Sequence, residues 1–133
     1  MIRYINTDLD LVAAYDLGPL TVALQSRGVS PLHITAGEDG RWYTTLETDV
    51  QHDQAETTID AMLDAIDSLN KSNRGLWEAC LVREFNLGFD CGDKPWAFNE
   101  GLTNVTLLRI GKVGASLRIT LYPPEKKRLR RKA

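Results

Sequence analysis

Short segments in which apolar and polar residues alternate constrain this chain more than any other feature. The clearest is 116–122, where Leu117, Ile119 and Leu121 point one way and the polar side chains between them point the other. Such alternation predicts a strand with one buried face. Because every good strand of the chain is apolar on one face only, we expect a sheet that helices cover on one side.

Four further segments predict strands. Residues 1–11 have β-type side chains at their start, although their alternation is poor. Residues 31–36 and 41–48 alternate on either side of the turn 37–40, whose Asp-Gly end is typical of a hairpin. Residues 81–90 have one apolar face. That face carries Leu81, Phe85, Leu87 and Phe89.

Three segments have the spacing of helices. They are residues 16–27, residues 53–69 and residues 103–113, the last with Thr103 as its capping residue. Residues 70–75 follow the second helix and are rich in polar side chains and glycine. We therefore interpret 70–75 as a short connector.

The second helix carries a run of acids. Asp53 and Glu56 have the spacing of a capping box, with Asp in place of the usual Ser or Thr. Asp60, Asp64 and Asp67 continue the run away from the apolar positions. A run of this kind on a helix most often marks a solvated face, and that is the prediction here.

The expected order of elements is β-α-β-β-α-β-α-β. Its first six elements match the split plan of ferredoxin-like domains, and a helix and a strand are then added. We therefore predict an α+β fold, a two-layer sandwich with a ferredoxin-like β-α-β-β-α-β core and a mainly antiparallel sheet. Residues 1–124 form one domain of ordinary size, long enough to bury a core without a metal or a disulfide.

Charge is unevenly distributed along the chain. Residues 125–133 carry six basic side chains and one acid, which leaves ten basic and seventeen acidic residues in 1–124. We expect 125–133 to be a flexible basic tail. Weak nucleic-acid binding by this tail is one functional alternative. The acidic body and the lack of an aromatic RNA motif on the candidate strands argue against nucleic acid as the main partner.

The composition indicates a cytoplasmic setting. No apolar run approaches the roughly 20 residues that span a bilayer. Asn6 and Asp8 interrupt the N-terminus too early for a signal peptide. Cys80 and Cys91 stand at opposite ends of one predicted strand, so we expect two free thiols, as in a reducing compartment.

Residues 83–92, 95–98 and 114–123 carry a family resemblance. These segments and the order of elements resemble small uncharacterised bacterial α+β proteins, a family of unknown function. The resemblance implies the fold and a bacterial cytoplasmic setting. It implies no catalytic residue.

The loop 90–96 is the one segment that concentrates reactive groups. Its Cys91 needs a base to act as a nucleophile, and the only histidines are His33 and His52. The neighbouring Asp90 and Asp93 raise the pKa of a thiol, and the pair lacks a third ligand for a metal. A small hydrolase or transferase that uses this loop is therefore an alternative, and we predict no metal and no cofactor.

Trp96 and Phe98 follow the reactive part of the loop. Aromatic side chains in such loops often plug the end of a core, which is the first interpretation. The second is that Trp96 is an exposed anchor for a partner.

The open face of the sheet is the surface where we expect function. By strand parity it carries a mixture of tyrosine, arginine, amide and carboxylate side chains, which suits recognition of a protein or a small polar ligand. The residues singled out are Tyr43, Glu84, Asn86, Arg118 and Tyr122. Glu84 and Arg118 are predicted to pair across adjacent strands. We therefore predict a non-catalytic domain that binds a protein partner, a second copy or a ligand through this face. The other interpretation is a plain solvated face.

Overall fold

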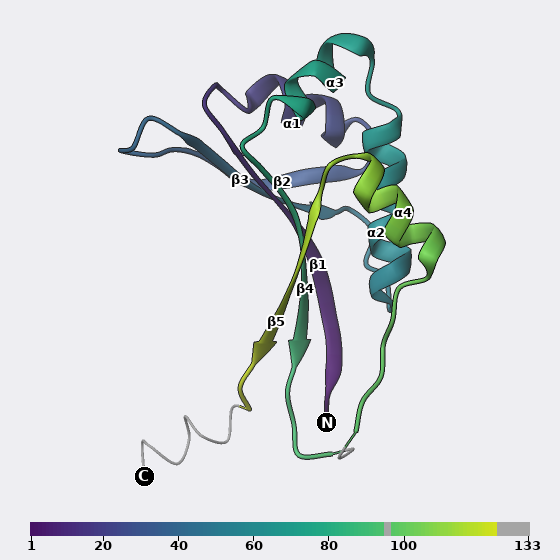
Figure 1. Ribbon diagram of the computed structural model, residues 1–133. Coiled ribbons are helices and arrows are strands. Elements are labelled where there is room, and N and C mark those ends of the chain that lie inside the picture. The colour runs from purple at the N-terminus through teal and green to yellow at the C-terminus, as the bar shows by residue number, and fades with distance from the viewer. Residues whose placement is uncertain (95–96, 125–133) are drawn as a thin grey trace.

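A computed structural model describes residues 1–94 and 97–124, and its elements follow one another as Figure 1 shows. Strands and helices alternate irregularly along the chain. In chain order they are β1 (Arg3–Ala13), α1 (Gly18–Gln25), β2 (Val29–Ala36), β3 (Trp42–Thr48), α2 (Ala55–Asp67), α3 (Lys71–Glu78), β4 (Val82–Asp90), α4 (Asn104–Lys112) and β5 (Ser116–Tyr122).

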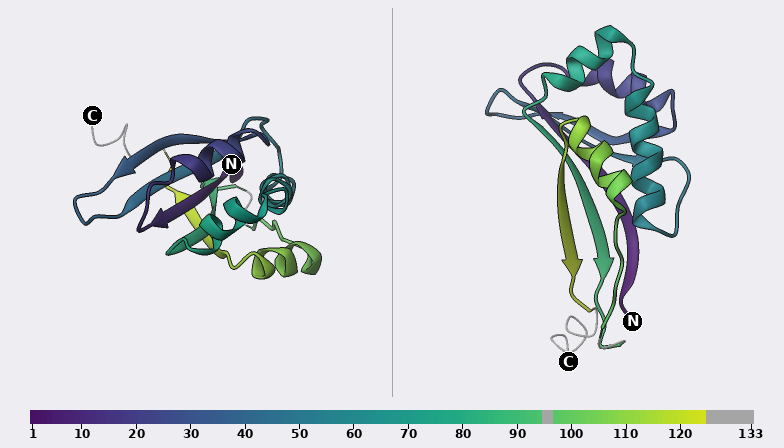
Figure 2. Two further views of the ribbon diagram at one scale, coloured as in Figure 1. Left: turned by 90° about the horizontal axis from the view of Figure 1, so that it is seen from above. Right: turned by 45° about the vertical axis from the view of Figure 1, so that its right-hand side comes forward.

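The five strands form one mixed sheet in the order β2-β3-β1-β4-β5. The pairs β2–β3, β1–β3 and β1–β4 are antiparallel, and β4–β5 is parallel. The helices lie together on one side of the sheet, as the two views of Figure 2 show. The fold is therefore α+β with a sheet layer and a helix layer, and the prediction that one face of the sheet is open is consistent with this arrangement.

The core lies between the sheet and α2. Alternate residues of β1, β3 and β4 point toward the helices and are fully buried, among them Leu9, Leu46 and Phe85. The apolar positions of α2 meet them with the helical spacing that the sequence predicts. These positions are Ile59, Met62, Leu63 and Ile66.

Helix α3 replaces the connector that was predicted for residues 70–75. Asn70 caps it by accepting a hydrogen bond of 2.8 Å from the backbone N–H of Asn73. Trp77 is fully buried and donates its indole N–H to the carbonyl of Val113 at 2.9 Å. This contact, between residues far apart in the sequence, stabilises a helix that contains few apolar residues of its own.

The start of α2 also differs from the prediction. Gln54 is its N-terminal capping residue and makes no side-chain capping bond. The prediction of a capping box formed by Asp53 and Glu56 is therefore wrong. The carboxylate of Glu56 accepts instead from the backbone N–H of Thr103, at the start of α4. Glu56 therefore joins two helices where the sequence predicted a local cap.

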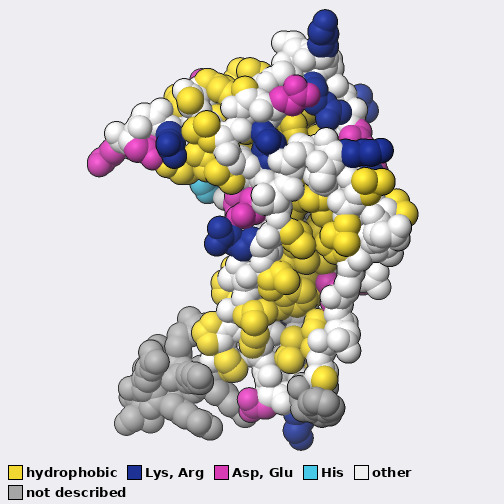
Figure 3. All heavy atoms as spheres, viewed as in Figure 1, with side chains coloured by type: hydrophobic (Ala, Val, Ile, Leu, Met, Phe, Trp, Pro, Cys, Tyr) yellow, Lys and Arg dark blue, Asp and Glu magenta, His cyan; other side chains and the backbone are white. Residues whose placement is uncertain are grey.

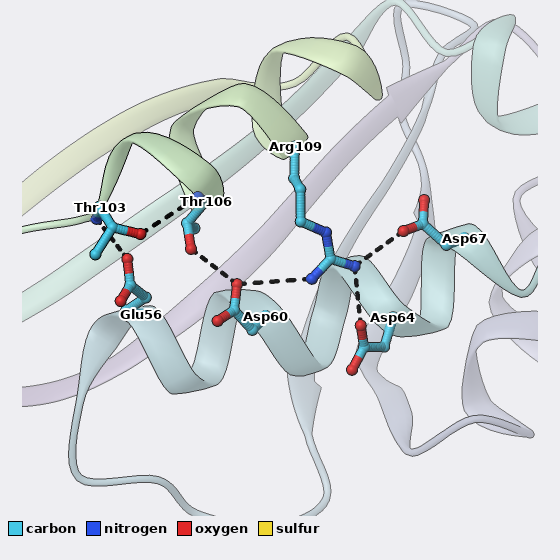
Figure 4. Close-up of polar contacts among 7 residues, drawn as sticks. All are labelled: Glu56, Asp60, Asp64, Asp67, Thr103, Thr106 and Arg109. Carbon is cyan, nitrogen blue, oxygen red and sulfur yellow. Dashed lines mark hydrogen bonds and ion pairs between the residues drawn. The ribbon is translucent and has the colours of Figure 1, made fainter.

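The acids of α2 form a receiving surface for α4, as Figure 4 shows. The guanidinium of Arg109 donates to Asp64 at 2.8 Å and to Asp67 at 2.9 Å, and it lies 3.8 Å from Asp60. The hydroxyl of Thr106 donates to Asp60 at 3.0 Å. The predicted solvated face is confirmed, because these carboxylates are exposed, but they also bind the neighbouring helix, which the sequence did not predict.

Replacing Arg109 with Met tests this receiving surface. We expect the free energy of unfolding to fall by about 1.5 kcal/mol, because several exposed ion pairs are lost and the carboxylates one turn apart then repel each other. Lysine at the same position should restore part of the loss through its charge. Urea unfolding at low and high salt measures the effect, and a loss that does not shrink at high salt would contradict the electrostatic explanation.

Two further expectations concern the whole chain. Cys80 and Cys91 are free thiols, as predicted. Within residues 1–94 and 97–124, none of the helices has both the length and the apolar content of a membrane span.

Candidate binding face on the open side of the sheet

The face of the sheet that points away from the helices consists of alternate residues of neighbouring strands. Asp10 pairs with Thr45 on one side and with Glu84 on the other, and Asn86 pairs with Asp8 and with Arg118. Side chains that are distant in the sequence therefore lie in rows across the strands. The two central rows are Thr45–Asp10–Glu84–Ser116 and Asp8–Asn86–Arg118.

Three of the residues predicted for this face, Glu84, Asn86 and Arg118, lie close together. Arg118 donates its Nε–H to the carboxylate of Glu84 at 2.6 Å, which confirms the predicted cross-strand pair. Thr120 donates its hydroxyl to the amide oxygen of Asn86 at 2.7 Å. Tyr122 lies further along β5, opposite Asp90. The structure thus gathers the predicted residues of β4 and β5 on one surface.

Tyr43 shares the face but lies at its other end. It pairs with Val12 and Thr35 near the hairpin turn, and its hydroxyl donates to Asp39. This bond lowers the pKa of the Asp39 carboxyl. Tyr43 is thereby held against the turn, away from the residues of β4 and β5.

The sequence interpretation missed the contribution of β1. Asn6 donates its amide N–H to Asp8 at 3.1 Å and also to Glu47, while Thr45 donates to Asp10 at 2.7 Å. The signal was present, because Asp8 and Asp10 alternate with buried leucines in this strand. The irregular start of β1, where its register with β4 shifts, conceals that alternation.

The face has an excess of negative charge at its centre. The pKa of the Asp8 carboxyl is raised to about 6. The largest cause is burial, and the negative charges of Glu47 and Asp10 add to it. The guanidinium of Arg118, three strands away from Glu47, is engaged by Glu84. The half-buried carboxylates of β1 and β3 thus lie beside one another at a cost in electrostatic free energy.

Replacing Asp8 with Asn removes a charge without changing the shape of the side chain. An aspartate whose pKa in the folded state is raised is most stabilising when protonated, so its contribution is lost as the pH rises through about 6. We expect Asp8→Asn to raise the free energy of unfolding at neutral pH by about 1 kcal/mol, after allowance for partial solvent exposure.

Urea unfolding between about pH 3 and about pH 7.5 measures the Asp8 effect, because the pKa of this carboxyl is ordinarily 3.8 and about 6 in the folded protein. The difference between the variant and the original chain should vanish toward acidic pH, where Asp8 is protonated in both states. A difference that stays constant across this pH range would contradict the assignment. The exposed Glu78→Gln on α3 provides a matched change of charge away from the face.

The loop candidates lie at one end of the same surface. Asp90, Cys91 and Asp93 line a hollow of about 890 Å³ together with Arg3 and Tyr122. Asp90 is paired with Arg3 at 2.9 Å, and the backbone N–H of Cys91 donates to the carbonyl of Tyr122 at 2.9 Å. Trp96 lies outside the described residues. Phe98 packs edge to face on Phe89 with 5.8 Å between ring centroids but is 39% exposed, so it covers the end of the core only in part.

Neither histidine approaches Cys91. His33 lies on β2, three strands away from β4. Its pairing with Thr45 places it in the row of Glu84, some six residues before the end of β4 that Cys91 follows. That corresponds to about 14 Å across the strands and about 20 Å along them. His52 lines a different hollow, of about 560 Å³. The structure therefore does not bring together a thiol and an imidazole base.

In the part of the chain that the structure describes, no cluster of three or more His, Cys, Asp or Glu side chains has the geometry to hold a metal ion. Comparison of the chain with family models, with curated proteins and with solved structures gives no match. What the protein does must therefore be argued from its own geometry.

Proposed function

We propose that this protein is a non-catalytic binding domain, and that it associates with a protein partner of basic surface through the open face of the sheet. The observation that carries the proposal is the group of half-buried carboxylates at the centre of that face, Asp8, Asp10 and Glu47. The nearby cation, Arg118, is already engaged by Glu84.

The electrostatics support a basic partner. A carboxyl whose pKa is raised by burial and by like charges destabilises the free protein at neutral pH, and a cation brought by a partner would relieve that cost. Proteins often carry such locally unfavourable arrangements where they bind something. Lysine and arginine side chains that approach β1 and β3 would be attracted at close range by the negative charge of these carboxylates.

The side chains of the face are already ordered in the free protein. Thr45 is bonded to Asp10, Asn6 to Asp8, and Thr120 to Asn86. Because these bonds restrict the rotamers before binding, little conformational entropy remains to be lost on association. The hollow beside Tyr122 and Asp90 offers a place for a side chain of the partner at the edge of the surface.

The type of fold and the cellular location are part of the same proposal. The order β2-β3-β1-β4 with antiparallel neighbours supports a ferredoxin-like plan for the first four strands. A bacterial cytoplasmic location is proposed from the sequence. A hydrolase or transferase built on Cys91 has less support, because His33 is distant and Asp90 is engaged by Arg3.

Photo-cross-linking in cells of the source organism tests the proposed function. A photoreactive amino acid at Thr45 or Asn86 samples the face away from the outer edge of β5, and the same residue at Glu78 on α3 samples the opposite layer. We expect adducts with one protein from the two face positions and none from position 78. The mass of the adduct distinguishes a different protein from a second copy of this chain.

A change of charge makes the test specific. Asp10→Lys places a cation at the centre of the face and should abolish the adducts, whereas Glu78→Lys makes the same change of charge elsewhere and should leave them intact. Circular dichroism confirms that both variants are folded. Adducts that survive Asp10→Lys, or a face that gives no adduct at either position, would refute the proposal.

A further inference from the structure

The helix-side face of β5 is apolar and uncovered. Leu117, Ile119 and Leu121 are 41%, 60% and 64% exposed, although their partners on β4 are buried. Those partners are Phe85, Leu87 and Phe89. The core therefore ends at β4, and the last strand of the sheet extends the same apolar surface into solvent.

The arrangement of the helices explains this exposure. The helices that pack on strands do so mainly on β1, β2 and β3, whereas α4 packs on α2. In Figure 1 the ends of β1, β4 and β5 extend beyond the helix layer. Figure 3 shows hydrophobic side chains gathered on the surface in this part of the molecule. Val105 and Leu108 of α4 add exposed apolar area, at 64% and 60%.

The backbone of β5 is also available along its outer edge. The carbonyl of Tyr122 points toward β4, because it accepts from the N–H of Cys91. Peptide groups alternate in direction along a strand, so those of Leu117, Ile119 and Leu121 point away from β4. Among the described residues no strand pairs with β5 on that side.

The two edges of the sheet differ in their protection against pairing. The edge strand β2 contains Pro31 and a register irregularity between Pro31 and His33, both of which disfavour the addition of another strand. Residues Ser116–Tyr122 of β5 contain neither device. Their single charge, on Arg118, is engaged by Glu84 on the polar face. The edge of β5 is thus built to accept a strand.

We propose that β5 pairs with β5 of a second copy of this chain, antiparallel, about a two-fold axis through Ile119. In this register Ile119 lies opposite Ile119 of the second copy, and Leu117 lies opposite its Leu121. The residues whose peptide groups point outward are then the ones that face each other, as a hydrogen-bonded antiparallel pair requires. The two sheets join into one continuous sheet.

A second copy suits this strand because the strand is self-complementary. Its strict alternation places apolar side chains opposite apolar ones on the helix side. On the polar side Arg118 lies opposite Thr120 of the second copy, so the two guanidiniums do not face each other. The polar faces of both copies then lie on one side. The pairing does not depend on the partner proposed above.

Sedimentation velocity of the full chain over a range of concentrations from micromolar to millimolar is the first test. A single paired strand buries a modest area, so we expect a reversible dimer whose mass doubles from that of the monomer as concentration rises. Ile119→Lys places two ammonium groups on the axis and should weaken the dimer by about tenfold or more. Val22→Lys on α1, 67% exposed in the monomer, is the matched control and should change nothing.

Disulfide trapping tests the register. In a Cys91→Ser background, Ile119→Cys brings two sulfurs together across the axis, where paired Cα atoms are about 5.5 Å apart. Mild oxidation should produce a covalent dimer from this variant. Thr120→Cys, which lies opposite residue 118 of the second copy, should produce it much more slowly.

Three results would overturn the proposal. One is a chain that stays monomeric at every concentration, and another is a dimer that Ile119→Lys leaves unchanged. The third is a monomer that dimerises only after deletion of residues 125–133, since the tail would then occupy the strand edge itself. Asp10→Lys, which tests the proposed function, should leave the dimer intact, so the two proposals fail independently.

Discussion

Replacing Trp77 with Ala is expected to lower the free energy of unfolding by about 4 kcal/mol. The indole is fully buried, so the substitution leaves a large cavity that the surrounding side chains fill only in part. It also removes the donor to the Val113 carbonyl, a bond of 2.9 Å. Because small domains have a total stability of about 5–15 kcal/mol, a loss of this size brings the chain close to unfolding.

Two further variants separate the contributions of Trp77. Phenylalanine keeps most of the apolar volume and loses the hydrogen bond, so Trp77→Phe should lose about 1–2 kcal/mol and remain measurable if the alanine variant does not fold. Trp42, on β3, is only partly buried, and Trp42→Ala should lose less than Trp77→Ala. Urea unfolding followed by circular dichroism measures all three. Equal losses for Trp42→Ala and Trp77→Ala would contradict the packing shown by the structure.

Trp77 also shows where prediction from the sequence failed. Helix α3 has only eight residues, includes Gly75, and buries little besides this indole. No local pattern distinguishes such a segment from a polar connector, because the contact that stabilises it comes from Val113, far along the chain. By contrast, β5 and α4 were predicted correctly, since strict alternation and the Thr103 cap are local signals.

The candidate face was predictable on β4 and β5 and less so on β1. Parity alone places Glu84 and Arg118 on one surface, and their pairing follows once the strands are neighbours. The pairing of Asp8 with Asn86 depends on strand order, which the alternation in a single strand does not specify. The role of the α2 acids was missed for the same reason, since Asp64 meets Arg109 only when α4 packs beside α2.

The second large effect is expected at Arg83, which joins three segments through their backbone. Its Nη1 donates to the carbonyls of Trp77, Glu78 and Cys80 at 3.2, 3.0 and 2.9 Å, and its Nε donates to that of Gly114 at 2.9 Å. A cation at the end of α3 thus donates to carbonyls of the last turn and of Cys80 just beyond it, and it adds to the bond that the Trp77 carbonyl already accepts from the N–H of Cys80. Arg83→Met keeps the apolar stem and removes every one of these bonds.

We expect Arg83→Met to lower the free energy of unfolding by about 3 kcal/mol, because bonds from a charged donor contribute more than neutral ones and the carbonyls are left partly desolvated. Lysine retains the charge but lacks the planar group whose N–H donors reach all four carbonyls, so Arg83→Lys should recover less than half of the loss. Urea unfolding gives both values. A lysine variant as stable as the original chain would show that charge alone matters at this position.

The same substitution should act on the binding face from a distance. Gly114 lies two residues before β5, so loss of its bond to Arg83 frees the start of the strand that carries Arg118. Hydrogen exchange should therefore accelerate in β5 by local opening, beyond what the lower global stability produces in β1 and β3. Because β5 supplies both the Arg118–Glu84 pair and the proposed edge contact, the Arg83→Met variant should weaken the dimer while every side chain of the interface remains in place. Uniform acceleration across the sheet would instead mean that Arg83 contributes only to overall stability.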